Sequence, residues 1–213
     1  MLTLLSGHAI GKRTAHNRLM QLTCSFLAGV GIMILLLLSF TVLVLQHILS
    51  NNTPLIAWAA GAGLLIGLGV AVWAFYYRHG KGTSLWLPRG IARYLADRTK
   101  STKSGAEAFG LGLTSGVAEL IFTLAPMLIT ALVLIQLEPL WQLIGIAIYT
   151  LISLLSLLIV YAMVGGGHKL SKIQKWRETN KRFLQFAAGA GLLILGFYVY
   201  VEKVIAIAMA GGN

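Results

Sequence analysis

The chain has 213 residues, of which 57% are hydrophobic and only 11% are charged, and its mean hydropathy is +0.81. A soluble domain carries about 25% charged residues, so this composition excludes a soluble enzyme and a disordered chain. A single cysteine excludes an intramolecular disulfide and a cysteine metal cage. The net charge of +11 predicts which loops of a membrane protein face the cytoplasm, and no nucleic-acid partner is expected.

Five apolar stretches are long enough to cross about 30 Å of hydrocarbon as helices. In chain order the predicted spans are Met20–Leu45, Leu55–Tyr77, Ala106–Ile135, Leu140–Val164 and Phe183–Val201, the last with an extension to Ala210. The first stretch is too long for the apolar region of a cleaved signal peptide. The sequence therefore predicts an all-α integral membrane protein with five transmembrane helices.

The basic residues predict the orientation of these helices. Sixteen of the 17 lie before the first span, between the second and third, or between the fourth and fifth, and only Lys203 lies on the other side. By the positive-inside rule the N-terminus is cytoplasmic and the C-terminus external. We therefore expect a multi-pass protein of the inner (cytoplasmic) membrane, whose anionic cytoplasmic leaflet is its lipid partner.

The spans divide the chain into four segments. The predicted segments are a cytoplasmic N-terminal part (1–19), two transmembrane helices (20–77), a basic cytoplasmic loop (78–105) and three further transmembrane helices (106–210). Within the loop, Leu87, Ile91 and Leu95 recur at helical spacing. This spacing predicts an amphipathic helix lying on the membrane surface, with a solvated basic loop as the alternative.

An eight-residue sequence occurs twice. Ala59–Ile66 in the second span is identical to Ala187–Ile194 in the fifth, at an offset of 128 residues. Composition alone is one explanation, because Ala, Gly and Leu are common in membrane helices. The charge distribution, however, places the two copies in opposite directions, which is typical of inverted repeats. We therefore expect an inverted repeat of a three-plus-three fold that lacks its first helix, with the third span starting the second repeat.

Small residues recur every four positions on three of the spans. Such faces let helix backbones approach closely in lipid. The residues predicted to pack helices in this way are Gly63, Gly67, Gly112, Gly116 and Gly191.

The third span carries the candidate site. Glu119 is the one acidic residue deep inside any predicted span, about 15 Å along the helix from Phe109. An ionisable group at this depth is costly when charged, and it marks either a proton or ion site or a neutral interhelical hydrogen bond. Thr114, Ser115 and Thr123 supply neighbouring hydroxyls, and Pro126 is expected to kink the helix beyond Glu119. Glu107, in the first turn, is expected to be structural.

The stretch Gly110–Glu119 resembles the fourth helix of a known family. That family is the transmembrane domain of cytochrome c biogenesis and disulfide-reductant transporters (CcdA/DsbD type, in the LysE superfamily). The resemblance implies a six-helix inverted-repeat scaffold and extends over Arg13–Val201. The family reads Pro-Cys where this chain has Ser115 and Gly116. Cys24 lies outside that motif, and thiol–disulfide exchange across the membrane is not expected.

Two functions therefore follow as expectations. The first is a small-solute or ion transporter with a midplane site around Glu119. The second is a redox-inactive CcdA-like protein that acts as a structural or assembly partner, as a homo-oligomer or with a partner helix in place of the missing first one. No enzymatic activity, cofactor or metal is expected, because the five histidines show no i, i+4 pairing and no catalytic motif is present.

Overall fold

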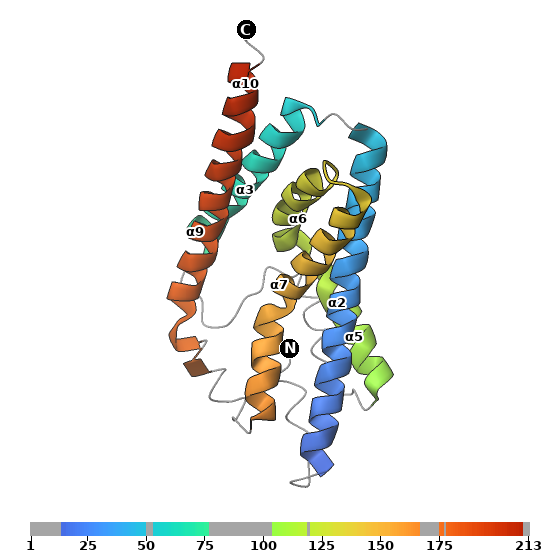
Figure 1. The fold of residues 1–213 in the computed structure, drawn as a ribbon. Coiled ribbons are helices and arrows are strands. Elements are labelled where there is room, and N and C mark those ends of the chain that lie inside the picture. Colours follow the sequence, from blue (N-terminus) through green and yellow to red (C-terminus); the bar gives the residue numbers. More distant parts are fainter. Residues whose placement is uncertain are drawn as a thin grey trace. The chain divides into compact units, whose positions relative to one another are not determined.

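The computed structural model of the chain describes residues 14–49, 53–76, 104–118, 120–166, 175–176 and 178–210. Every regular element in these ranges is helical (Figure 1). The elements are α2 (Thr14–Leu49), α3 (Leu55–Tyr76), α5 (Gly105–Ala118), α6 (Leu120–Leu134), α7 (Pro139–Gly165), α9 (Lys181–Val199), the π-helix η2 (Tyr200–Ile205) and α10 (Ala206–Ala210).

Within the described ranges, four helical stretches are long and apolar enough to cross a membrane. They are Arg18–Leu49, Leu55–Ala74, Pro139–Met163 and Lys181–Met209. Their composition leaves few polar side chains to be desolvated, while the helical backbone satisfies its own hydrogen bonds. The fold is therefore all-helical and compatible with a multi-pass membrane protein.

The third predicted span, Ala106–Ile135, corresponds to α5 and α6. These helices have 14 and 15 residues, and Glu119 between them lies outside the described residues. Neither helix alone reaches the roughly 20 residues that a bilayer requires. By helix length the part of the chain that the structure describes thus contains four spans, and a fifth crossing stays a prediction.

One helix end differs from that expected, and one confirms the extension that the sequence predicted. Helix α2 begins at Thr14, so the predicted N-terminal segment 1–19 ends in helical residues. A helix can extend beyond the hydrocarbon because its backbone is hydrogen-bonded internally, and the exposed Arg18 lies in this first part. At the other end, helical structure continues through η2 to Ala210. Residues 1–13 and most of the basic loop 78–105, with its predicted amphipathic helix, lie outside the described residues.

The chain forms two compact units. The first comprises Met1–Leu36, Gly80–Leu120 and Ala147–Thr179, and so contains parts of α2 and α7 together with α5. Its buried core is Phe26, Val30 and Leu111, against which partly buried aliphatic residues of α2 and α7 pack. Burial of apolar side chains between these helices gives the unit its cohesion through close packing.

Contacts between residues of different helices give the relative directions of the helices in this first unit. Gly29 of α2 lies against Phe109 of α5, and farther along both helices Met33 lies against Gly116, so α2 and α5 are parallel. Met20 lies against Gly165 and Leu154 against Gly31, so α7 runs antiparallel to α2.

The second unit comprises Leu37–His79, Ile121–Ile146 and Asn180–Asn213. Within it α3 packs against α9 and η2 (Figure 1). Gly196 lies against Leu65 and Ile66 near the start of the contact, and Gly189 lies against Trp73 near its end. The numbering increases along one helix as it decreases along the other, so α3 and α9 are antiparallel. The two copies of the eight-residue sequence consequently run in opposite directions.

Candidate functional site

The hydroxyl residues of the predicted site occupy different environments on α5. Thr114 is exposed, and its Oγ1 lies 3.1 Å from the carbonyl oxygens of both Gly110 and Leu111, to which it donates. Ser115 is buried, with 9% of its surface exposed. A Thr hydroxyl that donates to its own helix satisfies its proton locally and keeps its lone pairs available.

On α6, the helix continues through Pro126. The Pro126 carbonyl accepts a hydrogen bond from Thr130 Oγ1 at 2.9 Å. Proline has no N–H, so the carbonyl of Phe122, one turn earlier, loses its usual helical donor. Thr123 is half-buried on the same helix.

The predicted site residues belong to both units. Thr114 and Ser115 lie in the first unit, whereas Thr123 and Pro126 lie in the second. Glu119 lies outside the described residues. Each unit thus holds one pair of the predicted residues, and the grouping of these four residues around Glu119 stays a prediction.

Two of the predicted packing glycines lie where α5 meets α2. A Cβ on Gly112 would lie 2.9 Å from Val30 N and 3.0 Å from Gly29 Cα, both backbone atoms. A Cβ on Gly116 would lie 3.0 Å from the Met33 side chain. Backbone cannot yield as a side chain can, so Gly112 permits the closest approach of the two helices.

The other three predicted packing glycines face elsewhere. Within the described residues no heavy atom outside the local helix backbone lies within 4 Å of a Cβ built on Gly63, Gly67 or Gly191, and all three are exposed. Helix contacts fall instead on Gly61, which receives Ile129 of α6, and on Gly189, which receives Trp73. Residues two apart on a helix are separated by about 200°, so Gly61 and Gly63 cannot face the same neighbour.

This pattern is shared by the two copies of the repeated sequence. Gly61 and Gly189 are equivalent positions, and each accommodates a bulky side chain from a neighbouring helix. Gly63 and Gly191 are also equivalent, and both are open. The two identical sequences thus place packed and open glycines at equivalent positions.

Glu107 forms a capping box with Ser104. The Ser104 N–H donates to Glu107 Oε2 at 3.4 Å, and the Glu107 N–H donates to Ser104 Oγ at 3.2 Å. The two side chains thereby satisfy backbone donors that the first turn of α5 leaves without helical partners. The structural role expected for Glu107 is thus accounted for by a specific motif.

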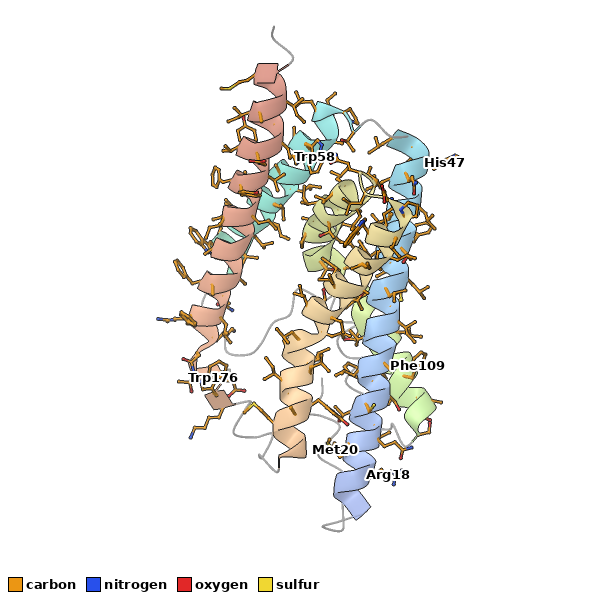
Figure 2. All side chains as sticks on the ribbon, viewed as in Figure 1. Arg18, Met20, His47, Trp58, Phe109 and Trp176 are labelled. Carbon is orange, nitrogen blue, oxygen red and sulfur yellow. The ribbon has the colours of Figure 1, made fainter. Side chains whose placement is uncertain are left out.

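A second polar cluster lies at the start of α3. Trp58, in the first turn of α3 (Figure 2), is 1% exposed. Its Nε1 donates to Thr53 Oγ1 at 3.2 Å, and Gln136 Nε2 donates to the same oxygen at 2.8 Å. Lys203 Nζ lies 5.5 Å from the centroid of the Trp58 ring, within cation–π range.

Sequence reasoning did not single out this cluster as a site. The available signal was Lys203, the one basic residue that the sequence places outside the predicted cytoplasmic side. Trp58 lies in the second predicted span, whereas Thr53 precedes that span and Gln136 follows the third. Thr53 and Gln136 are 83 residues apart in the sequence. Only the tertiary fold brings them together.

The described residues contain no group of three His, Cys, Asp or Glu that could hold a metal ion. Cys24 is exposed on α2 and is unpaired. Comparison with protein-family models, curated proteins and solved structures finds no match to this chain.

Proposed function

We propose that the protein is a small-solute or ion transporter of the inner membrane, built as an inverted repeat around a carboxyl group at Glu119. The observation that carries this proposal is the antiparallel pair α3 and α9, each containing one copy of the eight-residue sequence. In inverted-repeat transporters, substrate sites lie near the bilayer midplane between the two halves. The resemblance to the CcdA/DsbD-type scaffold supports the same architecture.

The proposed topology has five spans, with the N-terminus in the cytoplasm and the C-terminus outside. The parallel direction of α2 and α5, and the antiparallel direction of α7 relative to α2, agree with alternating crossings. Sixteen of the 17 basic residues then lie on the cytoplasmic side.

In the proposed mechanism Glu119 exchanges a proton for a cation, or carries a proton with a solute. A carboxyl within hydrocarbon is neutral unless a cation pairs with it. The Thr114 hydroxyl donates to its own helix, so its oxygen can accept a cation. Hard cations bind to such oxygen ligands.

The test is proton-coupled flux in proteoliposomes. Glu119→Gln removes the titratable proton but keeps the side-chain size, and we expect it to abolish flux driven by a pH gradient. Glu107→Gln is the matched control, because Gln also serves in a capping box, and its flux should equal that of the unmodified protein. Undiminished flux in Glu119→Gln would remove this carboxyl from the mechanism.

A second function, as an assembly partner in the membrane, is favoured by the exposure of α7 and α9. In the most apolar 18 residues of each of these two spans only 11% of the residues are buried. The corresponding fraction is 28% for α2 and 33% for α3. Large side chains such as Trp141, Ile152 and Phe197 are more than half exposed. Such faces contact either lipid or another protein.

This second function predicts a stable oligomer in mild detergent. Light scattering after size-exclusion chromatography measures the protein mass without the detergent contribution. A homo-oligomer should keep its mass on tenfold dilution, whereas a strictly monomeric species would count against a homo-oligomeric assembly.

A further inference from the structure

The cluster at the start of α3 combines hydrogen-bond donors around a buried indole. Thr53, Gln136 and Lys203 come from the segment before α3, the turn after α6 and the π-helix η2. All three lie in the second compact unit with Trp58. None belongs to the proposed site at Glu119, so the chemistry of the cluster is independent of the transport proposal.

The Thr53 hydroxyl accepts two hydrogen bonds, so its own proton is the group that it still has to offer. Thr53 Oγ1 accepts from both Trp58 Nε1 and Gln136 Nε2. A hydroxyl oxygen has two lone pairs and one proton. Both lone pairs are therefore used, and the proton is left to donate to an acceptor that the described residues do not provide.

Lys203 adds a positive charge to these neutral donors. It is half-buried, and its ammonium lies over the Trp58 ring. Glu202 directly precedes Lys203, and Glu138 lies two residues after Gln136. Both carboxylates are exposed, and neither forms an ion pair with Lys203 among the described residues. An ammonium presents three N–H donors, and those that point away from the indole can contact a ligand.

The backbone at Lys203 is unusual. Tyr200–Ile205 forms a π-helical segment within an otherwise α-helical stretch. Such segments are rare and are frequently found at functional sites. Glu202 and Lys203 are the two charged residues between Phe183 and Asn213, and ionisable residues within apolar spans are costly and commonly functional.

We propose that Lys203, Thr53 and Gln136 bind a phosphate-type oxyanion, with Trp58 holding Lys203 and Thr53 in place. The set consists of one cationic donor and two neutral donors, which matches an oxyanion with several acceptor oxygens. Lysine is a common phosphate ligand because it acts as a compact point charge. The phosphate belongs either to a phospholipid headgroup or to a soluble phosphate ester, and both present the same group.

The experiment measures thermal unfolding of the purified, delipidated protein in a neutral detergent. Three probes are titrated: inorganic phosphate, dioctanoyl phosphatidylglycerol, and dioctanoyl glycerol, which has the same acyl chains without phosphate. Stabilisation as a function of concentration gives an apparent affinity by mass action. We expect stabilisation by at least one phosphate probe and none by dioctanoyl glycerol. Phosphatidylglycerol alone identifies a lipid headgroup, and inorganic phosphate identifies a soluble ligand.

Variants assign the effect to the cluster. Lys203→Met removes the charge while keeping an unbranched side chain, and should weaken binding by about tenfold or more, as expected for a charge-assisted contact. Thr53→Val should weaken it by about threefold to tenfold through loss of one neutral donor. Lys203→Arg should keep most of the affinity. Lys175→Met, at an exposed lysine, is the control for net charge and should bind normally.

Three results would overturn the proposal. They are equal stabilisation by dioctanoyl glycerol, no stabilisation by either phosphate probe, and equal affinity in Lys203→Met and Lys175→Met. If Lys203→Met does not fold, Thr53→Val and Lys203→Arg decide the matter, because normal binding in Thr53→Val together with loss in Lys203→Arg contradicts a donor-based site.

Discussion

At the scale of single residues, the effect of a glycine depends on the side of the helix that it faces. Gly112 lies against the backbone of α2, whereas Gly63 has open space around it within the described residues. Glycine weakens a helix by about 1 kcal/mol relative to alanine. That cost is offset only where the missing Cβ allows another helix to approach.

The first prediction compares alanine at these two positions. Gly112→Ala places a Cβ 2.9 Å from Val30 N, so α2 and α5 must separate, and we expect a loss of about 1–3 kcal/mol of stability. Gly63→Ala should be neutral or should gain up to about 1 kcal/mol from helix propensity. Thermal unfolding in detergent measures both, and equal destabilisation by the two variants would contradict the assigned contact.

The sequence could show that glycines recur at helix spacing but not which face is packed. The repeated sequence contains Gly61 and Gly63 on nearly opposite sides of α3, and both belong to small-residue patterns. The four-residue spacing through Gly67 favoured Gly63. In the structure the bulky Ile129 side chain occupies the other side, at Gly61. A pattern along one helix carries no information about the neighbour's side chains.

At the scale of elements, α3 and α9 are joined by an aromatic contact and by glycine-mediated packing. The rings of Trp73 and Phe186 stack with centroids 5.3 Å apart and planes 7° apart. Trp73 Nε1 also donates to the Phe186 carbonyl at 3.3 Å. Gly189, one turn from Phe186, leaves room for the indole. Aromatic pairs contribute about 0.5–1.5 kcal/mol beyond their buried area, which favours this one register of the two helices.

The second prediction tests that register with disulfides in a Cys24→Ser background. A Cβ on Gly69 would lie 2.8 Å from Leu193 Cγ, within the separation that a disulfide spans. Gly69→Cys with Leu193→Cys should therefore form an intramolecular disulfide under mild oxidation, seen as a mobility shift that reductant reverses.

The control for this cross-link is the pair Gly63→Cys with Gly191→Cys, at the two open positions. It should give no intramolecular product. Cross-linking of the control pair and not of the Gly69–Leu193 pair would show that α3 and α9 pack through the opposite faces.

At the scale of the whole molecule, charge asymmetry and helix direction make independent contributions to the topology. The basic residues predict which loops face the cytoplasm, and the contacts within each unit give the relative directions of the helices. Alternating crossings require α2 and α5 to be parallel and α3 and α9 to be antiparallel, as the contacts show. The side of the membrane on which each end lies is a prediction from charge.

The third prediction tests on which side of the membrane two of the loops lie. Glu138, in the turn between α6 and α7, and Thr179, before α9, are both exposed. In a Cys24→Ser background, Glu138→Cys should react with a membrane-impermeant maleimide in intact cells, and Thr179→Cys should react only after permeabilisation. The reverse pattern would invert the proposed orientation.

Composition and periodicity alone determined that the chain is helical and apolar, and they placed α3, α7 and the long C-terminal helix to within two residues at each predicted end. Those features are local, because a membrane-spanning helix satisfies its own backbone and is recognised by length and hydrophobicity. The tertiary structure decided which glycine of the repeat is packed, and it joined Thr53, Trp58, Gln136 and Lys203. These features depend on side chains from helices distant in the sequence, whose approach is set by the packing of the whole unit.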